Sequence, residues 1–327
     1  MIFRRKTFPK GTPSGQLSTF NYQLTSLLPF CMLNSAFCII TMDIRENVNL
    51  SLYNTFHTGG AAQFFAEVKT VEAAQEALLY AHKHQLPVLF LGGGSNVLFP
   101  DEGIKGLVIK NSINFIQSLD DTHLSVGAGV YTTSLAQHCL KLKLSGIEAL
   151  FGLPGTVGGA IRGNAGTLGT EIKDVLVDVT LIDDNNQLQT YPASYFEFEY
   201  RESILKRIPH FVTHCTIALT PGDEALIQNK MIETKNWRKD KQPGGFTAGS
   251  YFKNPPGTSA GALIDQAGLR GFNLGPAQVS PKHANFLTNT GKATTKDVIM
   301  LAAHVKKIVL EKFGIELEEE VKIIYHS

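Results

Sequence analysis

The sequence predicts an α+β fold. Predicted strands and helices occur in mixed order along the chain, without the strict strand–helix alternation of a doubly wound sheet. The 327 residues suffice for two or three compact units, and the Pro221–Gly222 pair is a plausible boundary between two of them. Glycine is enriched, at 30 residues, and its clusters indicate tight turns or backbone that closely approaches a ligand.

Capping residues and apolar periodicity predict four helices. The expected N-caps are Thr70, Thr132 or Thr133, Asp223, and Thr294, which has Asp297 at capping-box spacing. The corresponding helices end near residues 85, 144, 237 and 313. Apolar or alternating runs predict strands at residues 88–91, which we expect to be buried, and at residues 107–109, 124–126, 175–182, 211–219 and 321–325.

Composition and charge exclude several classes of protein. Apolar residues make up 43% and charged residues 18% of the chain, as in ordinary globular proteins. A net charge of +1 gives no electrostatic case for binding nucleic acid or an acidic membrane surface. No Cys/His cluster has zinc-ligand spacing, so we expect no metal site, and free thiols in a reducing compartment are the simplest interpretation of the four cysteines.

Residues 1–41 do not resemble the rest of the chain. Three basic residues at 4–6 precede an apolar run at 27–40, which Pro29 interrupts. A signal peptide is one interpretation of this order. We prefer an over-long gene start, with Met42 as the true first residue, because no motif lies earlier; the segment is then dispensable. The run is too short and too broken to predict a membrane span.

Three glycine clusters are the main functional signal. Residues 91–96 follow a predicted strand, and their backbone N–H groups can either hold a pyrophosphate or form a hairpin turn. Residues 151–166 mix six glycines with apolar residues, which favours backbone packed against a flat ligand. Residues 127–132 begin like a dinucleotide fingerprint but have Thr132 at the third glycine position, with Glu148 about 20 residues beyond the cluster. A Rossmann-type NAD(P) dehydrogenase is therefore an alternative.

Four blocks of the sequence resemble the UDP-N-acetylenolpyruvoylglucosamine reductase (MurB) family: residues 91–98, 151–166, 248–255 and 317–321. The resemblance extends over residues 49–325. It implies a vanillyl-alcohol-oxidase (PCMH) type FAD-binding domain at 49–221, in two subdomains split near residue 106. It also implies a smaller substrate-binding α+β domain at 222–327. Relatives with covalent FAD carry a histidine in the first glycine loop; this loop has none, so we expect non-covalent FAD.

The family resemblance also implies a reaction and the residues that perform it. NADPH would reduce FAD, which would reduce UDP-N-acetylglucosamine enolpyruvate to UDP-N-acetylmuramate in the cytoplasm. By motif match, Arg201 and Glu320 stabilise the enolate and Ser250 donates the proton. The family pattern has proline where Glu319 stands, and Glu320 is matched because it directly precedes Val321. A tyrosine-bearing insertion found in one family branch is absent after Leu219, which indicates the shorter branch.

The remaining site residues follow from the same blocks. The expected FAD-binding residues are Gly92, Gly93, Gly94, Ser95, Asn96, Gly127, Gly129, Gly152, Pro154, Gly155, Gly158, Gly159, Asn164 and Gly166. The expected substrate-binding residues are Tyr200, Arg238, Lys241 and Asn254. We expect no membrane or nucleic-acid partner, and a monomer. A catalytically silent flavin-binding module is a second alternative, which substrate-dependent oxidation of NADPH would exclude.

Overall fold

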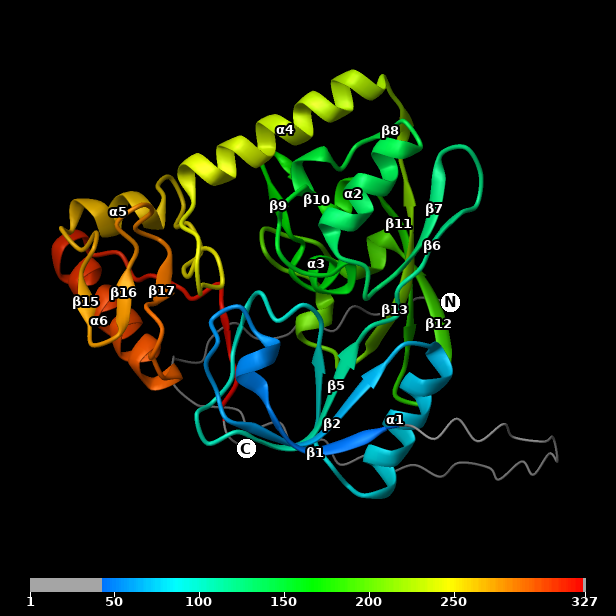
Figure 1. Ribbon diagram of the computed structural model, residues 1–327, viewed down its shortest axis with the longest axis horizontal. Coiled ribbons are helices and arrows are strands. Elements are labelled where there is room, and N and C mark those ends of the chain that lie inside the picture. The colour runs from blue at the N-terminus through cyan, green and yellow to red at the C-terminus, as the bar shows by residue number, and fades with distance from the viewer. Residues whose placement is uncertain (1–42, 326–327) are drawn as a thin grey trace, which may run out of the picture. The chain divides into compact units, whose positions relative to one another are not determined.

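The computed structural model describes residues 43–325, so the predictions for residues 1–41 lie outside the described part of the chain. The first sheet has the order β1-β2-β5-β3, and Figure 1 labels β1, β2 and β5. β1 (Ile44–Asn49) is antiparallel to β2 (Ala61–Val68), whereas β5 (Ile104–Asn111) is parallel to both β2 and β3 (Val88–Leu91). The predicted split near residue 106 falls within β5, and the chain leaves this sheet only after Asn111.

Helix α1 (Val71–Lys83) confirms the first helix prediction. The Thr70 side chain accepts a hydrogen bond from the Ala73 N–H, as an N-cap should, and Ala74, Ala77 and Ala81 are buried. The strand at 88–91 is also confirmed, but the expectation that it is buried was wrong. β3 is the last strand of its sheet, and only Leu91 of its four residues is buried.

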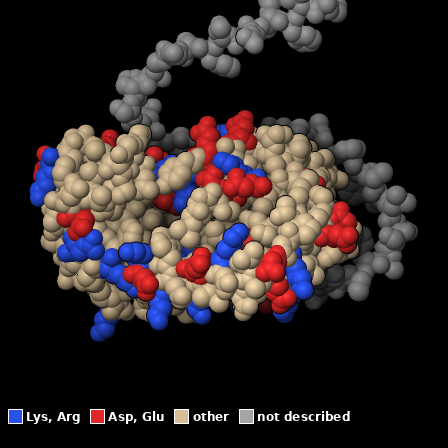
Figure 2. Space-filling model, turned by 90° about the horizontal axis from the view of Figure 1, so that it is seen from above, with Lys and Arg blue, Asp and Glu red and all other residues tan. Residues whose placement is uncertain are grey.

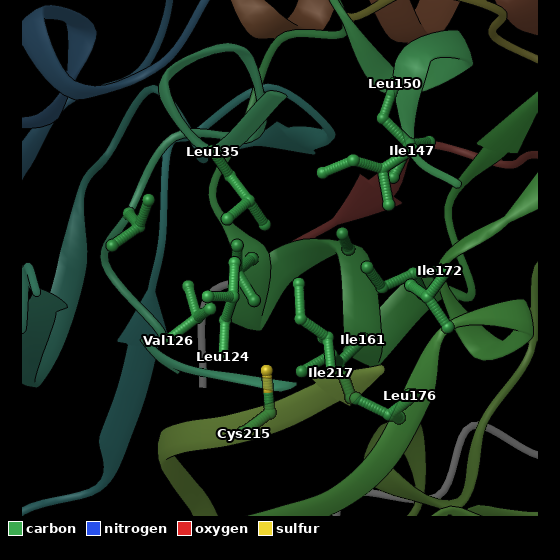
Figure 3. Packing of buried hydrophobic residues seen from close by; sticks show 14 of the residues in the cluster. Leu124, Val126, Leu135, Ile147, Leu150, Ile161, Ile172, Leu176, Cys215 and Ile217 are labelled. Carbon is green, nitrogen blue, oxygen red and sulfur yellow. The ribbon is translucent and has the colours of Figure 1, made fainter. Parts of the chain in front are cut away.

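The second sheet is antiparallel throughout, in the order β12-β11-β13-β7-β6. Its strands are β6 (Ile116–Ser118), β7 (His123–Gly127), β11 (Leu176–Ile182), β12 (Leu188–Pro192) and β13 (Phe211–Ala218). Side chains from β7, β11 and β13 pack with Leu135 of α2 (Thr132–Lys141) and Ile161 of α3 (Val157–Gly163) in one hydrophobic core (Figure 3). Cys139 and Cys215 lie buried in it as free thiols.

The predicted cap of α2 was wrong by one or two residues. Tyr131 is the N-cap, and no side chain caps this helix. Thr132 and Thr133 instead bond to the third glycine cluster: Thr132 Oγ1 donates to the Leu153 carbonyl (2.6 Å), and Thr133 Oγ1 accepts from the Gly152 N–H (3.1 Å). The helix also stops earlier than predicted, because Leu144 belongs to the short strand β8 (Leu144–Ser145).

Helix α4 (Glu224–Lys241) leads to the C-terminal part of the chain. Asp223 caps it, as predicted, and its buried Ile227 and Met231 join the core of the second sheet. The C-terminal elements are α5 (Ala260–Gln266), β15 (Asn273–Leu274), β16 (Ala277–Val279), β17 (Leu287–Asn289) and α6 (Thr295–Phe313). α6 has the predicted Thr294–Asp297 capping box and ends at Gly314, whose φ is 68°.

The C-terminal core also contains two residues from the first hundred of the chain. Phe56 and Leu98 are buried in it beside side chains of α5 and α6. In place of the predicted closing strand at 321–325, β18 (Lys322–Ile323) is short and pairs in parallel with β4 (Val97–Leu98). The chain end is therefore tied to the segment that follows the first glycine cluster.

Short elements complete the fold. Two pairs of short strands, β9 (Gly166–Thr167) with β10 (Thr170–Glu171) and β8 with β14 (Thr220–Pro221), are antiparallel. The 3-10 helices are Leu50–Tyr53, Glu148–Leu150, Ile172–Asp174, Ala193–Phe196 and Ile204–Lys206. Within residues 43–325, no helix is long and apolar enough to span a bilayer, and no group of three or more His, Cys, Asp or Glu is placed to hold a metal. Figure 2 shows acidic and basic side chains interspersed on one face.

Candidate active site

The first and third glycine clusters face each other at very short range. Ser95 Oγ donates to the Pro154 carbonyl (3.0 Å). A Cβ added to Gly93 would lie 2.9 Å from the Gly155 Cα, and one added to Gly92 would lie 2.7 Å from Thr156 Oγ1. Gly94 has a φ of 67°, and its Cβ would lie 1.9 Å from the Tyr53 carbonyl oxygen. These positions need glycine because the chain's own atoms occupy the space beside them.

The two facing clusters leave a group of hydrogen-bond donors unused. The backbone N–H groups of residues 92–96, 155, 156 and 159 donate to no acceptor in the described chain. Thr156 Oγ1 is buried there and also has no partner. Of these residues only Gly94 and Thr156 are buried, whereas Asn96 and Gly159 are exposed, so a ligand can reach the unused donors from the surface. Several unused N–H groups on two facing loops suit the pyrophosphate of a dinucleotide, so the residues present fit FAD. We call this arrangement the glycine cradle.

The second glycine cluster supports the third. A Cβ added to Gly127 would lie 2.4 Å from the Ile113 carbonyl oxygen, and one added to Gly129 would lie 2.7 Å from the Ile113 nitrogen. The Gly158 N–H donates to the Ala128 carbonyl (2.9 Å), and a Cβ on Gly158 would meet the Ala128 Cβ at 2.9 Å. These glycines allow close packing of segments. Gly129 also lines an open cavity of about 390 Å³, together with Glu67, Lys69, Lys110, Ser112, Asn114 and Tyr131.

The structure excludes the Rossmann-type dehydrogenase alternative. Gly127 ends a strand of an antiparallel sheet, whereas a dinucleotide fingerprint needs a parallel βαβ unit. Glu148 is buried and bonds to its sequence neighbours: its carboxylate accepts from Ser145 Oγ (2.5 Å) and from the Gly146 N–H (3.0 Å). These hydrogen bonds, with a charge contribution from Lys230, outweigh the effect of burial and lower the pKa of Glu148.

Arg201 and Glu320, which are 119 residues apart in sequence, form an ion pair. Arg201 Nε donates to Glu320 Oε1 at 2.9 Å, and Arg201 Nη2 donates to the Gly166 carbonyl at 2.8 Å. Their side chains are only 22% and 16% exposed. Burial raises the pKa of Glu320 above its ordinary value, although the charge and hydrogen bond of Arg201 act in the opposite direction. Gly166, predicted to bind FAD, thus orients a predicted catalytic side chain.

A strained turn carries Arg201. Glu199 and Glu202 exchange backbone hydrogen bonds of 3.2 Å in both directions, so Tyr200 and Arg201 lie at the tip of a two-residue turn. Arg201 has a φ of 57°, a left-handed conformation that costs a non-glycine residue about 1–2 kcal/mol. The Arg201 guanidinium lies 5.0 Å from the centre of the Tyr200 ring. Strain of this kind persists where surrounding contacts determine the conformation.

Ser250 and Glu320 come from two segments that pair with each other. Phe252 and Glu319 form an antiparallel bridge, and the Glu320 N–H donates to the carbonyl of Tyr251, the residue after Ser250 (2.8 Å). The Ser250 hydroxyl forms no hydrogen bond with any residue from 43 to 325 and is partly exposed. Asn96 Nδ2 donates to the Glu320 carbonyl (3.1 Å). The structure therefore brings together the segments that carry the three predicted catalytic residues, and Asn96 links them to the glycine cradle.

The predicted substrate-binding residues have different environments. Tyr200 is exposed beside Arg201, and Asn254 Oδ1 accepts from the Ala260 N–H (3.1 Å). Lys241 is exposed at the end of α4. Arg238 is buried, and its guanidinium donates to the carbonyls of Phe151 (3.2 Å) and Ala149 (3.4 Å). Arg238 thus supports the start of the third glycine cluster, and its contact with a nucleotide sugar stays a prediction.

Asn164 mainly orders the chain around the site. Asn164 Nδ2 donates to Glu171 Oε2 (3.1 Å) and to the Glu199 carbonyl (2.9 Å), next to the turn that carries Arg201. Its buried Oδ1 has no partner among the described residues and is free to accept from a ligand.

Sequence reasoning missed three groups of site residues. Thr156 was overlooked in favour of the adjacent glycines, although it stands inside the third cluster. Lys253 lies within the block at 248–255 and Glu202 directly follows Arg201, but no pattern in the sequence shows that they form an ion pair (2.8 Å). Asn285 has no sequence signal of its own: it is buried, its Oδ1 accepts from the Phe252 N–H (3.0 Å), and its Nδ2 donates to the Phe252 carbonyl (2.8 Å).

Comparison with known proteins identifies relatives that cover most of the described chain. A family model of the UDP-N-acetylenolpyruvoylglucosamine reductase C-terminal domain matches residues 240–324, and a model of an FAD-binding domain matches residues 62–191. A UDP-N-acetylenolpyruvoylglucosamine reductase of Chlamydia trachomatis is 40% identical over 282 residues, covering 86% of this chain and 96% of the relative. That of Listeria monocytogenes is 40% identical over 284 residues, covering 86% and 95%.

A solved structure of a member of the same family has a similar fold. The crystal structure of UDP-N-acetylenolpyruvylglucosamine reductase (MurB) from Thermus caldophilus has a TM-score of 0.75 and 36% identity, and the match covers 87% of this chain and all of that one. The predicted α+β fold with a PCMH-type FAD-binding domain is confirmed. The chain belongs to the UDP-N-acetylenolpyruvoylglucosamine reductase family.

Proposed function

We propose that this chain reduces UDP-N-acetylglucosamine enolpyruvate to UDP-N-acetylmuramate with NADPH, and that Arg201, Glu320 and Ser250 perform the chemistry on the substrate. The chain is an FAD-dependent oxidoreductase of peptidoglycan precursor synthesis. The observation that carries the residue assignment is the pairing of two segments beside the glycine cradle: one carries Glu320, which binds Arg201, and the other carries the unbonded Ser250 hydroxyl.

Bound FAD would supply hydride transfer between NADPH and the substrate. The glycine cradle would hold its pyrophosphate through the unused N–H groups and Thr156 Oγ1. The chain's side chains have a different task. Addition of hydride to the β-carbon of the enolpyruvyl group leaves negative charge on the α-carbon and the carboxylate, so the site must stabilise an enolate and protonate it.

Arg201 meets the first requirement. Its guanidinium is fixed by Glu320 and Gly166 before any substrate binds, and those contacts use Nε and Nη2, which leaves Nη1 for a carboxylate. A preorganised cation in a partly buried site stabilises developing negative charge without reorganisation at the moment of reaction. Glu320 holds this cation in place and balances its charge while the site is empty of substrate.

Ser250 meets the second requirement. A serine hydroxyl is a weak acid in water, but an enolate is basic enough to accept its proton. The hydroxyl of Ser250 has no other hydrogen bond in the described chain, so its proton is available to a substrate carbon. We further propose that the chain acts as a monomer in the cytoplasm, where a reducing environment would preserve Cys139 and Cys215 as thiols.

The test is to purify the protein and measure NADPH oxidation with and without the enolpyruvyl substrate. We expect a yellow protein with flavin absorption at about 370 and about 450 nm, whose NADPH consumption requires the substrate. A yellow protein that consumes no NADPH with this substrate would be a silent flavin-binding module, and the proposed function would be wrong.

A further inference from the structure

Glu202, the residue after Arg201, is the centre of a second charge cluster. Its Oε1 accepts from Lys253 Nζ at 2.8 Å and from Lys206 Nζ at 3.0 Å. Lys253 Nζ also contacts Glu318 Oε1 at 2.6 Å. These four residues form a chain of alternating charges, which we call the Glu202 network: Lys206, Glu202, Lys253 and Glu318.

The Glu202 network connects the two segments that carry the proposed chemistry. Glu202 closes the turn that presents Arg201, and Lys206 also donates to the Arg201 carbonyl. Lys253 lies three residues after Ser250, and its backbone N–H donates to the Glu318 carbonyl (2.8 Å), in the segment that presents Glu320. The network therefore joins the turn bearing Arg201 to the strands bearing Ser250 and Glu320.

The cations around Glu202 support a role for its carboxylate in holding the neighbouring segments together. Burial alone would raise the pKa of Glu202, but the hydrogen bonds from Lys253 and Lys206 outweigh it and lower that pKa. Arg162 contributes a further cation: its carbonyl accepts from Ser203 Oγ, and its guanidinium interacts with the charge of Glu202. Without Glu202, three cations would lose the carboxylate that offsets their mutual repulsion.

We propose that Glu202 is a positioning residue which, through Lys253 and Lys206, holds the strained Arg201 turn against the Ser250 strand in the geometry that substrate reduction requires. The inference rests on the proposed function, because it concerns the half-reaction with the enolpyruvyl substrate. Arg201 and Ser250 act on the same substrate from different segments, and a displacement of about 1 Å between reacting groups can cost 10²-fold in rate. Hydride transfer from NADPH requires neither group.

The experiment measures both half-reactions of the FAD-loaded enzyme by stopped-flow absorbance at about 450 nm, the flavin band. Glu202→Gln and Lys253→Met each remove one charge of the central pair. We expect each to slow reoxidation by saturating enolpyruvyl substrate by about ten- to a hundred-fold. Flavin content and the rate of reduction by NADPH should stay within about two-fold. The double variant should be no slower than the worse single variant, because one ion pair cannot be broken twice.

Two further variants separate positioning from other effects. Glu202→Asp keeps the charge but withdraws the carboxylate by one methylene, so a positioning role predicts slow reoxidation here too. Glu197→Gln is the matched control, since Glu197 lies just before the same turn and forms its ion pair with Arg207, which is not a member of the network. We expect this control to behave like the unaltered protein.

Several outcomes would overturn the inference. Wild-type rates in Glu202→Asp would show that only net charge matters. Equal slowing of both half-reactions would indicate a general structural role, and multiplicative effects in the double variant would show that the two residues act independently. If Glu202→Gln does not retain FAD, Lys253→Met decides the question alone. Failure of the unaltered protein to be reoxidised by the substrate would instead contradict the proposed function.

Discussion

The glycine cradle and the proposed catalytic cluster bind their ligands with different atoms of the chain. The cradle uses backbone N–H groups, and its shape depends on segments that approach too closely for any side chain. The catalytic cluster uses side-chain charges, namely Arg201 with Glu320 and the Glu202 network beside them. Asn96 is part of both regions, because it ends the cradle loop and donates to the Glu320 carbonyl.

This difference predicts how each region responds to substitution. Adding a Cβ to a glycine of the cradle would push its closely packed backbone segments apart. Changes there should therefore impair folding and flavin retention together. Altering one charge in the proposed catalytic cluster adds no atom that clashes with the backbone, and at most displaces the Arg201 turn slightly. Changes there should therefore impair chemistry more than folding. The variants below test this distinction in order of expected effect.

Gly94→Ala should have the largest effect. The new Cβ would lie 1.9 Å from the Tyr53 carbonyl oxygen at a φ of 67°, so the loop cannot keep its conformation. We expect protein that is insoluble or lacks FAD, as measured by the flavin absorbance of the purified fraction. The matched control is Gly163→Ala, in the third cluster, where a Cβ has no neighbour within 4 Å. Normal flavin content in Gly94→Ala would refute the cradle geometry.

Ser250→Ala should give a large but selective loss. Reduction of the flavin by NADPH creates no enolate, so that half-reaction should proceed near the normal rate. Reoxidation by the enolpyruvyl substrate should slow by about 10²–10⁴-fold, the usual contribution of a general acid. Stopped-flow absorbance resolves the two rates. Unchanged reoxidation would mean that the proton comes from another donor, and Ser250 would lose its assigned role.

Glu320→Gln should separate activity from stability. Because burial raises the pKa of Glu320, the folded protein binds that proton more tightly than the unfolded chain. Glu320 therefore favours folding at low pH, and this contribution is lost as the pH rises through the raised pKa. We expect the variant to be slow in substrate reduction, yet to have a higher Tm than the unaltered protein at pH 8. The Tm difference should shrink toward pH 4; a lower Tm at pH 8 would contradict this.

Tyr251→Phe should have the smallest effect and should act on stability alone. Tyr251 follows Ser250 in sequence, its side chain is fully buried, and its hydroxyl has no partner in the described chain. An unsatisfied buried hydroxyl costs about 1–3 kcal/mol, so its removal should stabilise the fold by about 1 kcal/mol. Urea unfolding measures this change. A destabilised variant would show that the hydroxyl is hydrogen-bonded, for instance to a buried water.

Much of the fold follows from local sequence. Thr70, Asp223 and the Thr294–Asp297 box begin helices as predicted, because capping depends on residues three positions apart. The prediction that Thr132 or Thr133 caps a helix was wrong, because their hydroxyls instead bond to the third glycine cluster, about 20 residues away. The burial of β3 was also mispredicted, since an apolar run does not show whether its strand will lie at the edge of a sheet.

By itself, the sequence determined the family and the segments proposed to carry its chemistry: the glycine clusters, the Tyr200–Arg201 pair and the segments around Ser250 and Glu320. Only the tertiary structure decided how these segments meet. It showed that glycine at 93 and 94 accommodates the chain's own backbone, that Glu148 bonds only to neighbouring residues, and that Glu202 and Lys253 form an ion pair. The reason is physical: a residue's type fixes what it can bond to, whereas its partner, 51 residues away for Glu202, is fixed by packing of the whole fold.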